Sequence, residues 1–310
     1  MDISFPALKS INDAVSLAFN SQLWAAPGIY KQFTYDASST GSEEVYPRLD
    51  MIPGLREWIG ERVVNWLTQT TFTIKNKTFE GTVGLKREDI EDDKYGLLSP
   101  VAAQMGENAG RLPDLLVAKL LLNGHTTLGI DGQNFFDTAH ANYGANGNAT
   151  TIANYQADTG GGGTPWFLFD TSKVLKPFIF QTRRPFKTVA KFSMTDENTI
   201  WADEYIWGVD GRCNAGYGLW QLAYCSYAPL THDNLVAART AMAEWRRPDG
   251  SPMGITGNLL VTPTKLFNKG RAYCENEFLP PGDPLVTGTA GTVGNDFQGL
   301  AKCIENVWLN

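Results

Sequence analysis

The sequence from Pro53 to Gly124, PGLREWIGERVVNWLTQTTFTIKNKTFEGTVGLKREDIEDDKYGLLSPVAAQMGENAGRLPDLLVAKLLLNG, contains two different hydrophobic periods in succession. Over residues 72–85 apolar and polar side chains alternate, which places the apolar ones on one face of an extended chain. Over residues 101–120 the apolar side chains recur at mostly helical spacing. The stretch therefore predicts two strands that lead into one long helix over residues 97–123.

The long helix has recognisable signals at both ends and one internal conflict. Ser99 suits the N-cap and Pro100 the first helical position, while Asn123-Gly124 is typical of a helix end. Pro113 lies inside the periodic run. A proline there removes one amide donor and clashes with the preceding turn, at a cost of about 3 kcal/mol or more. We therefore expect a kink or a break near residues 109–111.

The two strands are separated by the polar residues Lys75-Asn76-Lys77, which tolerate a turn. This arrangement predicts a hairpin over residues 72–85. A two-stranded ribbon is marginally stable alone in water, and no other segment is an obvious partner. We therefore expect the hairpin to lie against a neighbouring subunit.

Charged residues of both signs and two tryptophans surround the predicted hairpin. They could form a solvated surface, where each ion pair contributes little. We favour subunit contacts, because complementary charges fix the register of an interface and Trp and Arg are its usual anchors. A basic patch that includes Arg183 and Arg184 could touch DNA, but we favour contact with acidic loops of a neighbour. The residues expected at subunit contacts are Arg56, Glu57, Trp58, Glu61, Arg62, Trp66, Lys75, Lys77, Arg87, Arg183 and Arg184.

The composition is that of an ordinary globular protein, with 43% hydrophobic and 19% charged residues among 310 and a net charge of -7. The acidic balance argues against a primary nucleic-acid binder, which usually has a basic face. The four cysteines form no C-x-x-C pair, so reduced thiols are expected. We find neither a signal peptide nor an apolar run of about 18 residues, and predict no membrane contact.

Three acidic or imidazole side chains, Asp131, Asp137 and His140, together with His125, could be read as metal ligands of a hydrolase. No H-E-x-x-H, zinc spacing, P-loop or nucleophile elbow accompanies them. We favour a structural interpretation, in which Asp137 and His140 satisfy backbone groups in a tight turn. The sequence therefore predicts no enzyme activity, no cofactor and no metal site.

The remaining chain is predicted to be mixed α and β. A short helix over residues 8–19 precedes a polar, extended arm with little core of its own, for which a frayed terminus is the alternative. Residues 125–165 are rich in Gly and Asn and predict irregular loops. Strands are expected over residues 166–169, 178–180, 186–192, 205–209 and 219–223. After residue 230 the order is helix from a Thr231–Asn234 cap, strand 259–261, helix from residue 264, and strand 304–309.

Several of these motifs, in this order, resemble the major head subunit of Mu-like phages and prophages. The resemblance covers the chain from about residue 53 to the end, and the first fifty residues and the insert at 160–163 match poorly. The matching stretches are Gly54–Val64, Thr73–Lys77, Ile90–Asp93, Asp131-Gly132-Gln133, Phe135-Phe136-Asp137 with His140, Lys176-Pro177 with Gln181, Gly208–Arg212, Gly216–Leu222 and Leu260–Pro263.

This resemblance implies an α+β fold of the Hong-Kong-ninety-seven type, the tailed-phage major capsid fold. It implies an N-terminal arm (1–52), an extended loop (53–96), a peripheral domain (97–229) with its spine helix 97–123 and strands within 166–228, and an axial domain (230–310). Residues 54–67 fit both a helix and a strand, and the family favours a strand there.

The implied function is that of a major capsid protein, which self-assembles as hexamers and pentamers into an icosahedral shell around double-stranded DNA. Implied partners are scaffold and protease chains during assembly, the portal, a cement protein, and packaged DNA in weak non-specific contact. The implied location is the virion, assembled in the host bacterial cytoplasm. Alternatives are a metal-dependent hydrolase, a non-viral nanocompartment shell protein, and a tail or other non-shell structural protein.

Overall fold

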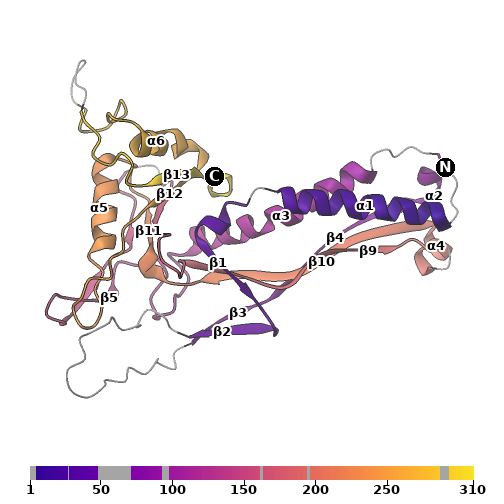
Figure 1. The fold of residues 1–310 in the computed structure, drawn as a ribbon, viewed down its shortest axis with the longest axis horizontal. Helices are drawn as coiled ribbons and strands as arrows, with labels where there is room; N and C mark the ends of the chain where they lie inside the picture. Colours follow the sequence, from indigo (N-terminus) through magenta and orange to yellow (C-terminus); the bar gives the residue numbers. More distant parts are fainter. Residues whose placement is uncertain are drawn as a thin grey trace.

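The computed structural model describes residues 5–26, 28–47, 71–92, 98–160, 163–193, 196–286 and 293–310. The molecule is elongated (Figure 1). One half is a long plate, in which two helices, α1 (Phe5–Ala25) and α3 (Leu98–Asn123), lie along one face of a sheet. The other half is a compact unit that contains α5 (His232–Ala243) and α6 (Thr264–Glu275).

The plate is a four-stranded sheet with the strand order β1-β9-β10-β4. The central strand pairs, β9–β10 and β10–β4, are antiparallel, whereas β1 runs parallel to β9. Exposure alternates along β4, as the period-two pattern predicts, because one face packs under the helices and the other does not. The strand bounds are β1 Thr34–Ser38, β4 Lys77–Lys86, β9 Phe178–Lys191 and β10 Glu204–Tyr217.

The two long helices of the plate pack closely because α3 has glycines where α1 crosses it. A Cβ atom on Gly106 or Gly110 would come within 3.0 Å of the α1 backbone, at Phe19 and Leu23 respectively. The apolar face of α1 therefore reaches the sheet, and Leu8, Val15 and Phe19 are buried. The expected arm with little core is wrong for the described residues, and so is the frayed terminus.

Of the kink or break predicted near residues 109–111, the break is wrong, because helix α3 runs without interruption from Leu98 to Asn123. Pro113 is a buried residue inside the helix. The next residue, Asp114, accepts a hydrogen bond from the amide of Tyr30 at 2.8 Å. Contacts with α1 on one turn and with the Tyr30 segment on the next hold the helix continuous, despite the lost hydrogen bond.

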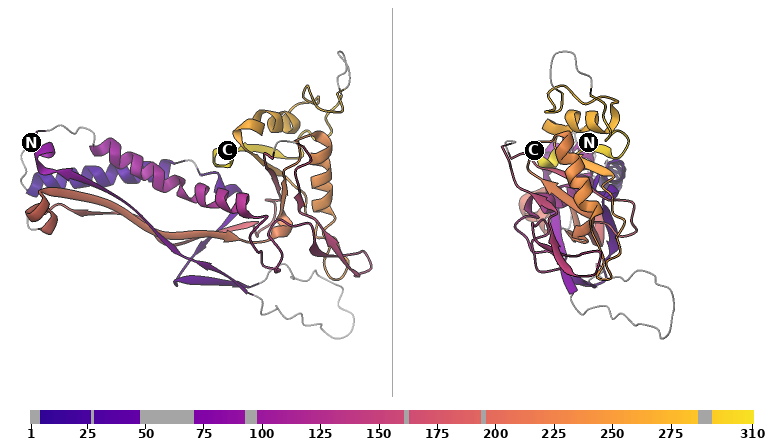
Figure 2. Two further views of the ribbon diagram at one scale, coloured as in Figure 1. Left: turned by 180° about the vertical axis from the view of Figure 1, so that it is seen from behind. Right: turned by 90° about the vertical axis from the view of Figure 1, so that its left-hand side faces the viewer.

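The predicted hairpin over residues 72–85 is also wrong. Strand β3 (Thr71–Lys75) pairs with β2 (Glu43–Pro47), and β4 pairs with β10. Asn76 makes no turn between β3 and β4, because its backbone amide bonds to the Ser42 carbonyl at 3.0 Å. In Figures 1 and 2 the β2–β3 ribbon leaves the sheet on the side opposite to α1 and α3.

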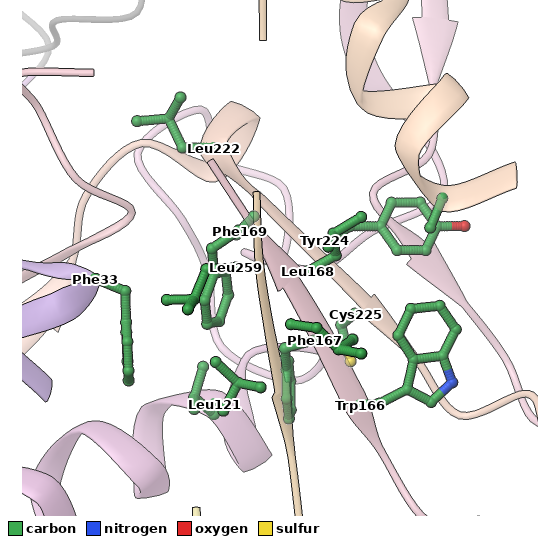
Figure 3. Close-up of a cluster of buried hydrophobic side chains, with 14 of the residues drawn as sticks. Phe33, Leu121, Trp166, Phe167, Leu168, Phe169, Leu222, Tyr224, Cys225 and Leu259 are labelled. Atoms are coloured by element: carbon green, nitrogen blue, oxygen red, sulfur yellow. The ribbon is translucent and has the colours of Figure 1, made fainter. Parts of the chain in front are cut away.

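The compact unit has a five-stranded mixed sheet with the order β13-β12-β8-β11-β7. Its centre is β8, whose four residues are all fully buried. In Figure 3, Phe167 and Phe169 lie toward Phe33 and Leu121, whereas Trp166 lies on the other side, with Tyr224. The strand bounds are β7 Tyr155–Gln156, β8 Trp166–Phe169, β11 Ala223–Ser226, β12 Leu259–Thr262 and β13 Lys302–Glu305.

Several local predictions are confirmed and others need correction. The Thr231 side chain caps α5 by accepting from the Asn234 amide, as expected. The two strands expected over 178–192 are the single strand β9, which passes through Pro185 at a register shift. The expected strand 219–223 is a 3-10 turn, η2, before β11, and the last expected strand is β13 followed by another such turn, η3. A hairpin of β5 and β6 lies within residues 125–165, where only loops were expected. These elements are η2 Trp220–Leu222, η3 Val307–Leu309, β5 His140–Tyr143 and β6 Ala149–Ile152.

Three short helical segments complete the chain. The turn η1 (Tyr30–Gln32) joins α1 to β1. The helices α2 (Arg87–Glu91) and α4 (Glu197–Ala202) lie at the far end of the plate, beside the start of α1. This end is the part of the plate most distant from the compact unit (Figure 1).

Candidate assembly surfaces

The β2–β3 ribbon is fixed to the plate at its root by Asn76. The Asn76 amide nitrogen Nδ2 donates to Ser39 Oγ at 2.7 Å and to the Gly41 carbonyl at 3.1 Å. Its Oδ1 accepts from Gln181 Nε2 at 2.9 Å. One side chain therefore joins the turn before β2, the junction of β3 and β4, and strand β9.

The turn before β2 is itself closed by a carboxylate. Glu44 Oε1 accepts from the amides of Thr40 and Gly41, at 2.5 and 3.1 Å, and from Ser39 Oγ at 3.0 Å. These hydrogen bonds, first those from the two amides, lower the pKa of the Glu44 carboxyl. The negative charge is thus held at the root of the ribbon, where it keeps the turn in one conformation.

An apolar contact seats the ribbon beside this network. Ile74 of β3 is only 4% exposed, and it lies on Gly216 of β10, where a Cβ would approach the Ile74 side chain within 3.0 Å. Gln181, fully buried, donates to the Ile74 carbonyl at 2.8 Å and accepts from the Tyr46 hydroxyl at 3.1 Å. The root is therefore well anchored, although β2 and β3 have only each other as sheet partners in the described part of the chain.

The structure brings together three of the residues that the sequence predicted at subunit contacts. Lys75 and Lys77 are exposed on either side of Asn76. Arg183 of β9 donates to the Ser39 carbonyl at 3.4 Å, on the same root. This cluster of three cations, the root cluster, surrounds the point from which the ribbon projects.

The other predicted contact residues are elsewhere. Arg184 forms an ion pair with Asp210 of β10, and Arg87 lies 3.9 Å from Asp203 at the far end of the plate. The remaining predictions stand outside the described residues: Arg56, Glu57, Trp58, Glu61, Arg62 and Trp66, together with the strand expected over 54–67.

Exposed apolar side chains mark surfaces that sequence reasoning missed. On α1, Leu17 is 72% exposed and Trp24 is 82% exposed, and their spacing of seven residues puts them on one face. Trp201 of α4, at the far end of the plate, is 86% exposed. Leu17 and Trp24 could have been found, because neither fits the buried stripe of Leu8, Val15 and Phe19. No sequence signal distinguishes Trp201 from a buried tryptophan.

An apolar pocket of about 280 Å³ lies between the ribbon and the body. Tyr46 and Phe72, which stack with their ring centroids 5.2 Å apart, form its wall on the ribbon. The opposite wall contains Ile130, Leu175 and Leu219. Apolar surface is thus concentrated where the ribbon leaves the plate.

The acidic and imidazole side chains considered as metal ligands do not gather in one place, and only Asp131 and His140 meet. His140 contacts Asp131 and Asn154, whereas Asp137 accepts from the amides of Thr138 and Ala139 in its own turn. His125 stacks on Tyr155 and Tyr227 instead. The turn role is confirmed for Asp137 and wrong for His140, whose ring contacts side chains.

The described residues also lack two features that the sequence analysis considered. They contain no group of three or more His, Cys, Asp or Glu side chains that could hold a metal ion. Within the same residues, no helix has the length and apolar character needed to cross a membrane. The four cysteines are buried and free, as expected for reduced thiols.

Comparison with known proteins gives matches over the whole chain. The family model described as "Mu-like prophage major head subunit gpT" matches residues 8–309. The major capsid protein of Escherichia phage Mu is 32% identical over the full length of both chains. The Mu-like prophage FluMu major head subunit of Haemophilus influenzae is 35% identical, over 84% of this chain and 85% of its own.

Solved structures agree with this assignment. The procapsid of bacteriophage JBD30 matches with a TM-score of 0.81 and 37% identity, over 98% of this chain and 99% of the other. The JBD30 capsid matches with a TM-score of 0.76 and 30% identity, over 92% of each chain. The fold is thus the α+β fold of Hong-Kong-ninety-seven-type capsid proteins, with a plate, a compact unit and a projecting ribbon. The chain belongs to the Mu-like prophage major head subunit gpT family, and its function is that of a major capsid protein.

Proposed function

We propose that this chain forms the icosahedral head shell of a Mu-like tailed phage, as hexamers and pentamers that enclose double-stranded DNA. The observation that carries the proposal is the β2–β3 ribbon, which is anchored at its root and has no further sheet partner in the described part of the chain. A two-stranded ribbon is marginal in water, so cover by a second copy would stabilise it. A capsid component belongs to the virion, and we propose assembly in the host bacterial cytoplasm.

We propose the following assignment of the capsid domains to parts of this molecule. Residues 97–229, which include α3 as the spine of the plate, would form the peripheral domain. Residues 230–310, which supply α5, α6, β12 and β13 of the compact unit, would form the axial domain around the capsomer axis. The extended loop includes residues 53–96, and β2 supplies the base of its first limb. Residues 1–52 otherwise act as the N-terminal arm, which α1 fixes to the plate.

Subunit contacts would use the root cluster and the exposed apolar side chains. Lys75, Lys77 and Arg183 present positive charge to acidic loops of a neighbour, and this fixes register more than it adds affinity. Trp24 and Trp201 are suited to anchor contacts, because a tryptophan buries a large area with few rotatable bonds. The other residues predicted for the same role stay predictions: Arg56, Glu57, Trp58, Glu61, Arg62, Trp66, Arg87 and Arg184.

Further partners are proposed from the family. Scaffold and protease chains would act during assembly, and a portal would occupy one vertex. A JBD30 structure that is 28% identical, with a TM-score of 0.74, is described as a capsid decorated with minor capsid protein trimers, which supports a cement protein on this shell as well. Packaged DNA would make weak, non-specific contact, consistent with the net charge of -7.

We propose that the chain acts without a catalytic step. Its function would be assembly through surfaces that become buried when subunits associate. Stable interfaces of this kind are large and apolar. A metal-dependent hydrolase is the weaker alternative, because Asp131 and His140 are paired with each other and Asp137 accepts from the amides of its own turn. The nanocompartment shell has no observation that favours it.

The proposal can be tested by shortening the loop without disturbing its root. Pro47 and Thr71 are register partners, so an Asn-Gly turn in place of residues 48–70 would close the ribbon as a two-residue hairpin. We expect a folded subunit, with circular dichroism like that of the full chain, that forms no closed particles in negative-stain microscopy. Normal particles from this variant would contradict the proposal.

A charge-reversal variant gives an independent test in case the shortened chain misfolds. Lys75→Glu with Lys77→Glu and Arg183→Glu changes three partly or fully exposed side chains and leaves Asn76 in place. We expect a folded subunit with fewer closed particles than the parent. The matched control is the same change at the exposed Lys9, Lys31 and Lys302, which are outside the root.

A further inference from the structure

Two of the four cysteines, Cys274 of α6 and Cys303 of β13, lie on elements that pack against each other in the compact unit (Figure 1). Both are buried, at 3% and 8% exposure, and both are free thiols. The other two lie in different sheets, Cys213 on β10 and Cys225 on β11. Cys274 and Cys303 are therefore the pair that the fold brings together.

The sulfur atom of Cys303 lies against α6 at a position where the helix has no side chain. A Cβ atom on Gly270 would come to 2.9 Å from Cys303 Sγ. The same Sγ lies 4.0 Å from the Phe267 carbonyl, about one turn earlier on α6. Gly270 thus lets the backbones of α6 and β13 approach closely. A disulfide needs such an approach, because its two Cα atoms lie within about 7 Å of each other.

Cys274 follows Gly270 by one turn, and its side chain is directed to the same place. Residues four apart share a face of a helix, and each side chain leans over the turn that precedes it. The Cys274 side chain therefore covers the surface over Gly270, where Cys303 Sγ lies, and the two thiols share a hydrogen bond. The backbone is also fixed here, since the Gly299 amide donates to the Cys274 carbonyl at 2.8 Å.

We infer that Cys274 and Cys303 are a redox pair, two thiols that hydrogen peroxide converts to a disulfide between α6 and β13. The bond would close the loop of residues 274–303 and fasten the last strand of the chain to the compact unit. Strand β13 is at the edge of its sheet, and β12 is its sheet partner among the described residues. A covalent link to α6 would therefore hold an edge strand that one neighbour alone holds in the sheet.

Cys303 is the thiol suited to react first. The hydrogen bond from Cys274, helped by the Thr262 hydroxyl 3.8 Å away, lowers the pKa of Cys303 in spite of its burial. The thiolate is the reactive form of cysteine, and Cys303 is also the more exposed of the two.

The reaction proceeds in two steps that together consume one peroxide. The Cys303 sulfur attacks one peroxide oxygen and the O–O bond breaks, which leaves a sulfenic acid on Cys303 and releases water. The Cys274 sulfur then attacks the Cys303 sulfur, the S–O bond breaks, and a second water leaves as the S–S bond forms. The two thiols lose two electrons and two protons in total, and these reduce the peroxide to two waters.

The timing of this step in the life of the particle rests on the proposed function. A bacterial cytoplasm keeps thiols reduced, whereas a released virion meets an oxidising medium. The pair is therefore expected to be reduced while subunits assemble and oxidised afterwards. The disulfide would then stabilise the finished shell without constraining the subunits as they associate.

Peptide mapping tests the bond without any variant. Particles would be reduced with dithiothreitol, freed of it, treated with hydrogen peroxide, unfolded in N-ethylmaleimide and cleaved with trypsin. Cleavage after Arg271 and Lys302 places the two cysteines on the separate peptides 272–302 and 303–310. We expect these peptides to be linked after peroxide and unlinked before it. Unlinked peptides after peroxide, with Cys303 either unmodified or converted to its sulfinic acid, would overturn the inference.

Thermal unfolding of subunits gives a second readout. Peroxide should raise the unfolding temperature of the unmodified chain by about 5 °C or more, reversibly on reduction, because a closed loop restricts the unfolded state. Cys303→Ser should show no rise, and the matched control Cys213→Ser, on β10, should show the full rise. Equal responses of the two variants would overturn the inference. Linked peptides in a chain that forms no particles would support the redox pair and contradict the proposed function.

Discussion

Ile74 of the ribbon lies directly on Gly216 of β10, at a place where no larger residue fits. A Cβ at position 216 would meet two atoms of the Ile74 side chain within 3.0 Å, and Ile74 is buried there. This contact, the Asn76 hydrogen bonds and the hydrogen bonds of Gln181 all hold the ribbon root against the plate. A substitution at Gly216 changes the Ile74 contact and leaves the Asn76 hydrogen bonds in place. It therefore tests whether the direction of the ribbon affects assembly independently of the stability of the subunit.

We predict that Gly216→Ala displaces the ribbon root, because overpacking at a filled site costs about 1–3 kcal/mol. The unfolding temperature should fall, and particle assembly should fall more steeply than stability. Gly84→Ala is the matched control in the same sheet, since its Cβ would meet nothing closer than the Glu204 carboxylate at 4.0 Å. Equal effects of the two substitutions on assembly would contradict the seating role of Gly216.

Gly106→Ala is expected to destabilise the subunit although alanine is the better helix former. In an exposed helix the change would stabilise by about 1 kcal/mol. Here the added Cβ would collide with the carbonyl of Phe19 in α1, and backbone cannot move aside as a side chain can. Thermal unfolding of purified subunits measures the sign of the effect, and an increase in stability would show that α1 does not pack on Gly106.

Gly106 and Gly110 show how much of the helix packing could be predicted from the sequence. The spacing Ala102, Gly106, Gly110 repeats small residues every four positions along α3, which is a signal for close helix packing that could have been read. The partner of that face, α1, could not have been read, because nothing local specifies which helix crosses another. The long helix and the α5 cap were predictable because they depend on periodicity and on neighbouring residues, whereas the fold class was expected from the family resemblance.

The hairpin error has a different physical cause. The alternation over residues 72–85 correctly predicts two extended segments, but strand pairing depends on remote groups. Asn76 is bound by Ser39, Gly41 and Gln181, up to 105 residues away, and these contacts keep the chain running forward where a turn was expected. The two strands expected over residues 178–192 form one strand for a related reason: Pro185 lies at a register shift of β9, where a missing amide costs little.

The stabilisation of the compact unit by His232 should be lost as the pH rises. Burial lowers its pKa, but hydrogen bonds from the ring to Asp296 and Asp233 more than offset this, and the net shift is upward. A pKa raised in the folded state means that the stabilisation is complete below the unfolded pKa and is lost as the pH rises through the folded pKa. Both aspartates are largely exposed, so the effect should be under about 1 kcal/mol.

The measurement for His232 is chemical denaturation across pH 5 to 9, compared with Asp296→Asn. The variant should lose most of the pH dependence in the neutral range, since it removes the partner of Nε2 without changing the size of the side chain. Asp158→Asn, an exposed carboxylate elsewhere on the surface, serves as the control. An unchanged pH profile in Asp296→Asn would show that this pair does not contribute.

Trp201→Ala is expected to reduce assembly while leaving the subunit intact. The side chain is 86% exposed, so its removal creates no cavity and should change the free energy of unfolding by no more than about 0.5 kcal/mol. If the far end of the plate contacts another copy, loss of a tryptophan anchor would weaken that contact by about 2 kcal/mol or more, which is at least a tenfold change in affinity. Val174→Ala is the control, because Val174 is equally exposed, at 87%, but belongs to the loop before β9. Particle yield by sedimentation, at subunit concentrations spanning two decades, distinguishes a shift in the assembly threshold from general loss of protein. If Trp201→Ala assembles at the same subunit concentration as the parent protein, Trp201 faces solvent in the shell as it does in the subunit.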